Sequence, residues 1–207
     1  MKIAVVDYGI GNLGSVTKAF RRFGAEPLLS GDAAELSAAD ALVLPGDGAF
    51  GASRDELERR GLSGVLRAHV ESGRVLLGIC IGMQLLFDES EEHGRHQGFG
   101  FLPGRVRRFD SEKLVVPHMG WNRLSARRPH PLLEGLPQDA YVYFVHSYWC
   151  DAAPEVVVAT SDYGHDFAAV VARDNVIGVQ FHPEKSQGDG LRMVENFVNL
   201  VRERVAA

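Results

Sequence analysis

The chain has 207 residues and carries 27 acidic against 22 basic side chains, a formal net charge of -5. This balance argues against nucleic acid as the main partner, because nucleic-acid-binding surfaces are basic. Hydrophobic residues make up 45% of the chain and charged residues 24%, which is typical of a folded domain. No apolar run approaches the ~20 residues of a membrane span. Because Met1 and Lys2 lead into a strand-like run without a signal-peptide pattern, we expect one cytoplasmic domain over 1–207 that has no membrane contact.

The two cysteines, Cys80 and Cys150, lie far apart in the sequence. They give neither a disulfide framework nor the ligand spacing of a zinc site. We therefore expect no metal and no cofactor. A reduced cysteine nucleophile suits the cytosol, where thiols stay reduced.

Strands and helices alternate through the first part of the chain. Apolar runs predict buried strands, at 3–6, 41–44 and 75–77. Helices are predicted between and after these strands, over about 12–23, around 55–60, over 62–71 and from Met83 onward. This alternation indicates an α/β fold with a doubly wound, mainly parallel central sheet and helices on both faces.

The second part of the chain is richer in short β segments. From Gly98 to about Thr160 the pattern predicts antiparallel additions to the fold, including 106–109, 141–145 and 156–159. A hairpin follows, with strands at 168–172 and 176–181. The last helix is predicted from about Gly190 to Glu203, because its apolar residues recur on one face.

One stretch combines a buried strand, a sharp turn and a helix start. Gly78, Cys80 and Gly82 have the spacing of a nucleophile elbow, with cysteine in place of serine. The helix N-terminus would favour a thiolate and offer backbone N–H groups to an oxyanion. By itself the stretch is equally consistent with a small buried cysteine in a core strand.

A glycine-rich loop and the end of the last predicted strand are expected at the same edge of the sheet as this stretch. A glycine-rich loop, 45–51, directly follows the strand at 41–44, at the sheet edge where open α/β folds bind ligands. The last predicted strand delivers His182, Pro183 and Glu184. Residues two apart in an extended chain point the same way, so Glu184 can orient His182 toward a nucleophile. Together with Cys80 they form a candidate catalytic triad.

These motifs resemble those of the class I (triad) glutamine amidotransferases. The resemblance rests on 78–84 (Gly-Ile-Cys-Ile-Gly-Met-Gln) and 181–184 (Phe-His-Pro-Glu). Within that family the chain resembles the glutaminase subunits of imidazole glycerol phosphate synthases. Four further stretches carry this closer resemblance, 7–13, 117–122, 144–148 and 184–187. The resemblance covers nearly the whole chain and implies the flavodoxin-like fold of the family.

The resemblance also implies roles for individual residues. Cys80 would attack the carboxamide of L-glutamine, His182 would transfer protons, and Glu184 would fix the imidazole. The oxyanion would be held by the backbone N–H of Ile81 and by an amide of the glycine loop. The loop residues concerned are Gly46, Asp47 and Gly48, with Gly46 placed beside the substrate. The amino-acid end of glutamine would be held by Gln84, Glu92, Ser147 and Tyr148.

The chain departs from the family pattern at two positions. Asp47 replaces a valine-like residue in the oxyanion loop, and a carboxylate pointing inward would repel the oxyanion. We therefore expect Asp47 to point to solvent or to a partner. Trp149 stands where the family usually has a tyrosine, which puts any gating role of that position in doubt.

The resemblance implies a partner that uses the ammonia, namely a (β/α)8-barrel cyclase subunit that receives it through a channel. The heterodimer would make imidazole glycerol phosphate and aminoimidazole carboxamide ribonucleotide in histidine biosynthesis. Trp121 is a candidate interface anchor, since tryptophan is enriched at binding hot spots, or else a core residue. Asn122 and Lys185 are further interface candidates.

Three alternatives stay open at this stage. The chain could serve another synthase, such as the one that makes pyridoxal phosphate, although 119–122 (Met-Gly-Trp-Asn) argues against this. It could be a stand-alone γ-glutamyl hydrolase, which would turn over well without a partner. It could also be a non-catalytic α/β binding module, which the intact triad disfavours.

Overall fold

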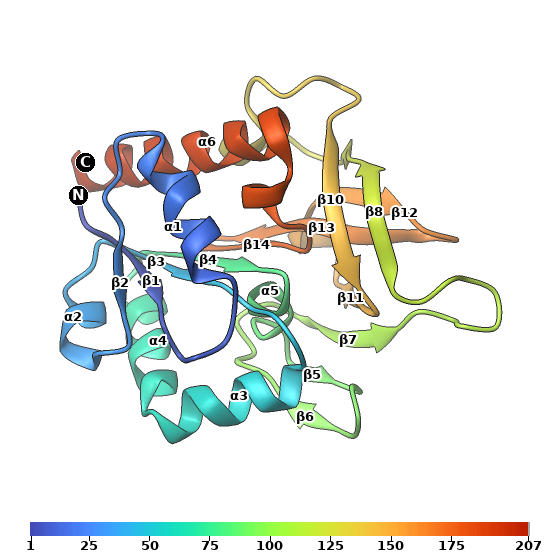
Figure 1. Ribbon diagram of the computed structural model, residues 1–207, viewed down its shortest axis with the longest axis horizontal. Coiled ribbons are helices and arrows are strands. Elements are labelled where there is room, and N and C mark those ends of the chain that lie inside the picture. Colours follow the sequence, from blue (N-terminus) through green and yellow to red (C-terminus); the bar gives the residue numbers. More distant parts are fainter. Residues whose placement is uncertain (207) are drawn as a thin grey trace.

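The structure, a computed structural model, describes residues 1–206 and is built around an eight-stranded sheet (Figure 1). Its strand order is β2-β1-β3-β4-β14-β13-β12-β9. The first five strands in this order are parallel and the last three are antiparallel. Their bounds are Leu28–Ser30 (β2), Ile3–Val6 (β1), Ala41–Leu44 (β3), Val75–Ile79 (β4), Val176–Val179 (β14), Asp166–Arg173 (β13), Val157–Asp162 (β12) and Ser125–Ala126 (β9). The predicted doubly wound, mainly parallel sheet is confirmed.

Helices cover both faces of this sheet (Figure 1). Helices α1 (Leu13–Arg21) and α6 (Gln187–Ala206) pack together on one face. The other face carries α2 (Ala33–Ser37), α3 (Phe50–Arg59) and α4 (Leu62–Glu71). Asn12 caps α1, because its side chain accepts a hydrogen bond from the backbone N–H of Ser15. Among residues 1–206, no helix combines the length and the apolar character that crossing a membrane requires.

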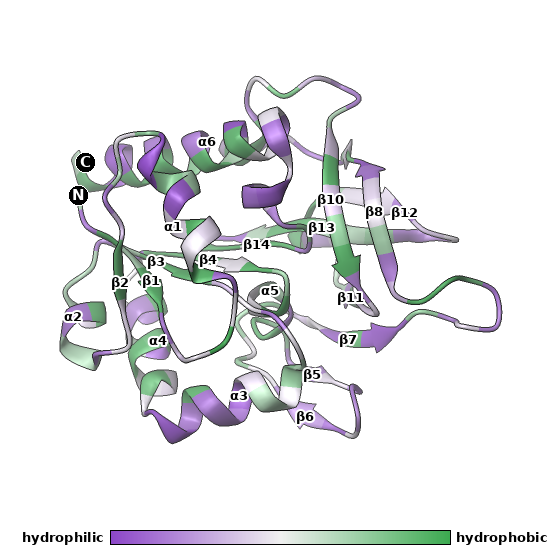
Figure 2. Ribbon diagram, in the orientation of Figure 1, coloured by the Kyte–Doolittle hydropathy of each residue, from purple (hydrophilic) through white to green (hydrophobic). Residues whose placement is uncertain are grey.

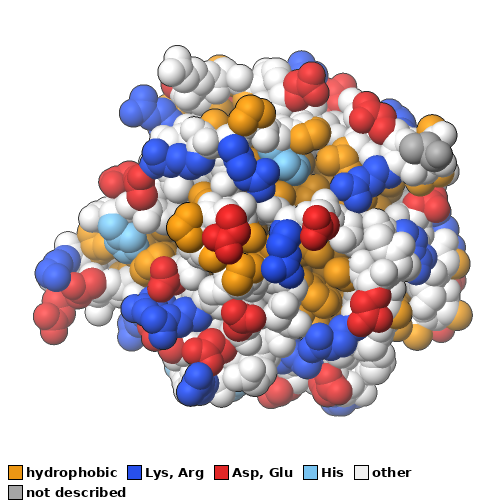
Figure 3. Space-filling model, turned by 180° about the vertical axis from the view of Figure 1, so that it is seen from behind, with side chains coloured by type: hydrophobic (Ala, Val, Ile, Leu, Met, Phe, Trp, Pro, Cys, Tyr) orange, Lys and Arg blue, Asp and Glu red, His pale blue; other side chains and the backbone are white. Residues whose placement is uncertain are grey.

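The core lies between the sheet and its helices. Every residue of β1, β3 and β4 is buried, as expected of parallel strands covered on both faces. Figure 2 shows hydrophobic residues along these central strands and hydrophilic ones on the outer faces of the helices. Phe20 of α1 meets Phe197 of α6 edge to face at 5.8 Å. On the surface that faces away from the viewer in Figure 1, acidic and basic side chains lie next to one another, with hydrophobic side chains between them (Figure 3).

Two small sheets stand beside the main one. Strands β8 (His118–Arg123) and β10 (Tyr141–His146) form an antiparallel ribbon, which we call the β8/β10 ribbon. The second small sheet has the order β11-β7-β5-β6. Its strands are Tyr148–Ala152 (β11), Gly104–Arg108 (β7), Glu89–Ser90 (β5) and His96–Gln97 (β6). Three short 3-10 helices complete the fold, Pro131–Leu133 (η1), Pro154–Val156 (η2) and Pro183–Lys185 (η3).

The helix that follows Cys80 is shorter than predicted. Helix α5 spans only Ile81–Gln84, although Leu85, Leu86 and Phe87 are fully buried. The carbonyls of these three residues accept hydrogen bonds from backbone N–H groups in 99–102 instead of from a further helical turn. A distant segment therefore ends the helix, and their apolar pattern reflects burial rather than a continued helix.

Candidate active site

Cys80 lies in the tight turn between β4 and α5, with backbone angles φ 55° and ψ -113°. The turn leaves no room beside it. A Cβ atom on Gly78 would lie 2.5 Å from the carbonyl oxygen of Gly82, and one on Gly82 would lie 1.9 Å from that of Leu44. The side chain of Cys80 is nearly fully buried, at 4% exposure. The strained turn and its glycines are those of the predicted nucleophile elbow.

The glycine loop after β3 touches this elbow. A Cβ atom on Gly46 would lie 2.4 Å from the backbone nitrogen of Gly82, so the two turns pack backbone against backbone. The hydroxyl of Tyr8 donates to the carbonyl of Pro45 at 2.8 Å and fixes the start of the loop. Burial raises the pKa of Tyr8, which keeps the hydroxyl a donor. The sequence did not single out Tyr8 for this role, because only the fold brings β1 beside β3.

Asp47 is exposed, in agreement with the expectation that it points away from the site. Its carboxylate Oδ1 accepts a hydrogen bond from the backbone N–H of Gly48 at 2.9 Å. Gly48 is itself exposed and adopts φ 76°. The backbone N–H of Gly48, one of the predicted oxyanion donors, thus already donates to a carboxylate of the same loop.

His182 follows β14, which lies directly beside β4 in the sheet. Its Nδ1 lies 2.8 Å from Oε1 of Glu184, and both side chains are at most 5% exposed. Burial disfavours a charged imidazole, but hydrogen bonds to Cys80 and Glu184 outweigh it and raise the pKa of His182 to about 10. The parallel register of β4 and β14 therefore brings the predicted triad to one sheet edge.

A buried amide network lies behind Cys80. Gln84 Nε2 donates to the carbonyl of Tyr148 at 3.0 Å and to Gln180 Oε1 at 3.1 Å. Gln180 Nε2 in turn reaches the sulfur of Cys80 at 3.9 Å. The Oε1 atom of Gln84 is buried without a hydrogen-bond partner among residues 1–206. Sequence reasoning missed Gln180, which lies between β14 and His182 without a motif of its own.

Glu92 is buried, at 7% exposure, although it comes from an acidic run. Its Oε2 accepts the backbone N–H of Phe50 at 2.6 Å, at the start of α3 just after the glycine loop. Carboxylates are favoured at such helix N-termini. Glu92 thereby ties the short sheet β11-β7-β5-β6 to the loop at 45–49.

The backbone at 147–148 is firmly held. The Ser147 carbonyl accepts the N–H of Phe109 at 3.1 Å. The Tyr148 carbonyl, which Gln84 already contacts, also lies 2.8 Å from Nδ1 of His146. His146 Nε2 lies 3.0 Å from Nδ1 of His118, in the directly opposite position of the β8/β10 ribbon.

Only one arrangement of protons satisfies this histidine pair. The amide of Asn122 donates to His118 Nε2 at 3.3 Å, so His118 must donate through Nδ1 to His146, and His146 must donate through Nδ1 to Tyr148. Both histidines are then neutral. Burial lowers the pKa of His118 to about 4 and that of His146 to about 3, in agreement with this arrangement.

The interface candidates lie in different environments. Trp121 is 46% exposed on the outer face of the β8/β10 ribbon, so it is not a core residue. Met119 and Tyr141 on the same ribbon are also exposed. Asn122 is half-buried, and its amide is held by the carbonyl of Asp162 as well as by His118. Lys185 is half-buried in η3, next to Glu184.

The second cysteine and Trp149 lie in the same strand, β11. Cys150 occupies the middle of that strand. Burial raises the pKa of Cys150 well above its usual value and keeps it a thiol. Trp149 is half-buried and packs against His165, with ring centroids 4.5 Å apart. In the part of the chain that the structure describes, no group of three or more His, Cys, Asp or Glu side chains could hold a metal.

Comparisons with known proteins agree with this geometry. The model of the family "Glutamine amidotransferase class-I" matches residues 4–200. The "Imidazole glycerol phosphate synthase subunit HisH" of Syntrophotalea carbinolica is 52% identical, over 94% of this chain and 98% of that protein. The subunits of the same name from Geobacillus thermodenitrificans and Methanosarcina barkeri are 50% and 44% identical, over at least 96% of both chains.

Solved structures show the same fold at lower identity. A glutamine amidotransferase superposes with a TM-score of 0.76 at 23% identity, covering 97% of this chain and 98% of that one. PurLQS from Thermotoga maritima gives a TM-score of 0.77 at 20% identity with the same coverage. The chain belongs to the class-I glutamine amidotransferase family. The relatives from Syntrophotalea carbinolica, Geobacillus thermodenitrificans and Salinibacter ruber, which are about half identical to the chain and match it nearly end to end, are HisH subunits.

Proposed function

We propose that this protein is the glutaminase subunit of an imidazole glycerol phosphate synthase. It hydrolyses L-glutamine to glutamate and passes the ammonia to a cyclase subunit, a (β/α)8 barrel. The observation that carries the proposal is the elbow cysteine, Cys80, which neighbours a buried His182–Glu184 pair that follows the adjacent strand, β14. The HisH relatives support the choice of synthase.

In the proposed reaction the Cys80 thiolate attacks the carboxamide carbon of glutamine, forming a C–S bond and a tetrahedral oxyanion. The imidazolium of His182 gives its proton to the amide nitrogen, the C–N bond breaks, and ammonia leaves. A glutamyl thioester remains. A water molecule then attacks it while His182 takes the water's proton, the C–S bond breaks, and glutamate departs. Glu184 holds the imidazole in the tautomer that both steps need.

The oxyanion is held by the backbone N–H of Ile81 and by a loop amide, of Asp47 or Gly48. Loss of one such donor typically costs ~3 kcal/mol of transition-state stabilisation. The contact between Gly46 and the elbow supports this assignment, since it sets the loop against the nucleophile. Gly46 also forms the wall beside the substrate carboxamide.

The amino-acid end of glutamine is held by Gln84, Glu92 and the backbone of Ser147 and Tyr148. The carboxylate of Glu92 suits the α-ammonium group, which offers three donors, and Gln84 is the second side chain expected at this end of the substrate. The carbonyl of Tyr148 accepts hydrogen bonds from both Gln84 and His146, which fixes the peptide that lines the other side of the site.

The cyclase docks on the outer face of the β8/β10 ribbon in this proposal. Trp121 is the anchor, and Lys185 is a further candidate for the contact, whereas the amide of Asn122 is already held inside the fold by His118 and Asp162. An exposed tryptophan beside exposed Met119 and Tyr141 has the composition of an interface core. We place the reaction in the cytoplasm, where the Cys80 thiol stays reduced.

Labelling with a glutamine analogue that carries a chloroketone, followed by peptide mapping, tests the proposal. We expect the label on Cys80, protection by glutamine, and no label in Cys80→Ser. Cys150 is the internal control, since it is buried and protonated. A label that misses Cys80 would overturn the mechanism.

A second measurement tests the partner. Ammonia release is followed with and without the cyclase subunit of an imidazole glycerol phosphate synthase, and with a pyridoxal phosphate synthase as the competing acceptor. We expect weak activity alone and strong stimulation by the cyclase only. High activity alone would favour a stand-alone hydrolase. Trp121→Ala should weaken the stimulation while leaving the labelling of Cys80 unchanged.

A further inference from the structure

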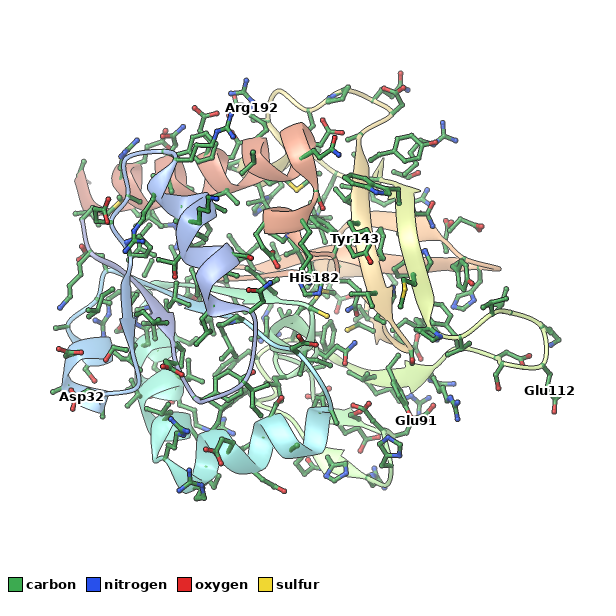
Figure 4. The ribbon with its side chains drawn as sticks, viewed as in Figure 1. Asp32, Glu91, Glu112, Tyr143, His182 and Arg192 are labelled. Carbon is green, nitrogen blue, oxygen red and sulfur yellow. The ribbon has the colours of Figure 1, made fainter. Side chains whose placement is uncertain are left out.

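Three hydrogen bonds join the backbone of His182 to strand β10. The N–H of His182 donates to the carbonyl of Tyr143 at 3.0 Å. The hydroxyl of Ser186 donates to the carbonyl of His182 at 2.6 Å and accepts the N–H of Tyr143 at 2.9 Å. Figure 4 shows Tyr143 and His182 side by side. Both polar groups of the Tyr143 backbone are therefore committed to the segment that carries the proposed base.

The Ser186 hydroxyl has no freedom in this arrangement. The side chain is 1% exposed, and the hydroxyl must accept from Tyr143, so its own hydrogen has to go to His182. The start of α6 closes over it, because a Cβ atom on Gly190 would lie 2.5 Å from the Cβ of Ser186. The bridge is thus a fixed link between two elements that are 43 residues apart in sequence.

The other side of β10 leads to the exposed ribbon face. Tyr143 stands directly opposite Trp121 in the ladder, and their rings meet at 6.1 Å at an angle of 67°. Tyr143 therefore contacts the exposed tryptophan through its side chain and the His182 segment through its backbone. A displacement of the β8/β10 ribbon is therefore transmitted to His182 through the hydrogen bonds of the Tyr143 backbone.

We propose that Ser186 is a positioning residue, whose hydroxyl locks the peptide of His182 to β10 and so makes the imidazole follow the β8/β10 ribbon. The inference rests on the proposed function, because it takes His182 as the base. In this proposal Ser186 holds the backbone carbonyl of His182, whereas Glu184 holds its imidazole ring through Nδ1. The inference also assigns the ribbon a second task besides docking.

A purely structural role for Ser186 makes a different prediction. Ser186 ends η3 and lies just before α6, and its backbone carbonyl accepts the N–H of Gly190. If the hydroxyl only supported this junction, its loss would lower stability without a specific effect on turnover. The two roles are separated by kinetics on a folded variant.

The test compares Ser186→Ala with Ser30→Ala, a matched control at the far edge of the sheet. The Ser30 hydroxyl also bridges a backbone N–H, that of Asp32, and a second acceptor, Glu35, and its side chain is 6% exposed. We expect Ser186→Ala to lower kcat by about ten- to hundredfold with KM for glutamine within about twofold, since misplacement by 1 Å costs about that much. Ser30→Ala should leave kcat and KM within about twofold of wild type.

Two further readouts complete the test. The pH dependence of Cys80 alkylation should shift in Ser186→Ala and not in Ser30→Ala, because only the first moves His182. Stimulation by the cyclase should fall in Ser186→Ala although the complex still forms. If Ser186→Ala does not fold, kcat of Ser186→Cys is measured instead, since a thiol keeps the volume and bonds more weakly.

Equal kcat values for the two alanine variants, with an unshifted alkylation profile, would overturn the positioning role. That result is distinct from failure of the proposed function. If the function itself were wrong, the chloroketone would miss Cys80 in the wild-type protein, whatever Ser186→Ala does.

Discussion

The carboxylate of Asp47 accepts a hydrogen bond from the backbone N–H of Gly48, the next residue, at 2.9 Å. This N–H is one of the loop donors that we propose for the oxyanion. While the bond exists, the donor is occupied and a negative charge stands beside it. In the proposed mechanism the loop exchanges this internal acceptor for the oxyanion during each turnover, and we expect this exchange to lower the activity of the isolated chain.

Replacement of Asp47 should therefore raise basal activity. We expect about threefold to thirtyfold faster ammonia release for Asp47→Val without the cyclase, part of the ~100-fold that one free donor is worth. Asp47→Asn should gain less, because its amide oxygen still accepts from Gly48. Release is measured at saturating glutamine. A slower Asp47→Val would show that the carboxylate supports the loop rather than competing with the oxyanion.

Gly82 should tolerate no side chain. A Cβ atom there would lie 1.9 Å from the backbone carbonyl oxygen of Leu44, which cannot move without breaking β3 from its loop. We expect Gly82→Ala to lose more than about 4 kcal/mol of unfolding free energy, or not to fold. Urea denaturation measures the change.

A matched control is available in α4. Gly64 is an exposed helical glycine, and a Cβ atom added to it would have no neighbouring atom within 4 Å. Gly64→Ala should stabilise the protein by about 0.5–1 kcal/mol, because alanine loses less backbone entropy on folding. Similar unfolding free energies for the two variants would contradict the close packing of the elbow.

The sequence was enough to predict the sheet and to select Cys80, His182 and Glu184 as candidate triad residues, because their signals are local. The apolar runs of β1, β3 and β4 and the glycines around Cys80 each reflect one element and its immediate turn. The carboxyl ends of parallel strands lie at the same edge of a sheet, and the observed neighbourhood of β14 and β4 places His182 at the edge where Cys80 stands.

Other features depend on contacts between distant segments. Helix α5 ends at Gln84 because backbone N–H groups at 99–102 bond to the carbonyls that follow it. Glu92 is buried because its carboxylate accepts the backbone N–H of Phe50 at the start of α3. Tyr8, Gln180 and Ser186 each make a hydrogen bond to a residue far away in the sequence, at 37, 100 and 43 positions respectively. No periodicity or motif in the sequence encodes such pairings, so only the structure identifies them.

The neutral histidine pair should make stability fall in acid. Burial lowers the pKa of His118 to about 4 and that of His146 to about 3, below the ~6.5 of an unfolded histidine. Between these values the unfolded chain binds protons that the folded chain does not. Unfolding free energy therefore decreases as pH falls from about 6.5 toward 4.

His118→Asn should reduce this slope. Loss of one such histidine removes up to about 1.4 kcal/mol per pH unit from the dependence in that range. Chemical denaturation at several pH values between 4 and 7 measures the effect. The exposed His93 supplies the control variant His93→Asn. Equal slopes for His118→Asn and wild type would mean that His118 has the same pKa in the folded and the unfolded protein.

The charge of His182 should depend on Glu184. Burial opposes that charge, yet the hydrogen bonds to Cys80 and Glu184 raise the pKa of His182 to about 10. Because the folded value lies above the unfolded ~6.5, the stabilisation from the charged imidazole is complete below about pH 6.5 and is lost as pH rises through about 10. Glu184→Gln removes one negative neighbour, so this loss should begin at lower pH.

NMR titration of ring-labelled His182 from pH 5.5 to 10.5 gives the midpoint directly. We expect a lower midpoint in Glu184→Gln than in wild type, and a smaller decrease in Glu184→Asp, which keeps the charge at a greater distance. Turnover should fall by at least about tenfold in Glu184→Gln, since the general acid is both less charged and less well oriented. An unchanged midpoint would mean that the Cys80 sulfur alone keeps the imidazole charged, and that Glu184 acts only by fixing the ring.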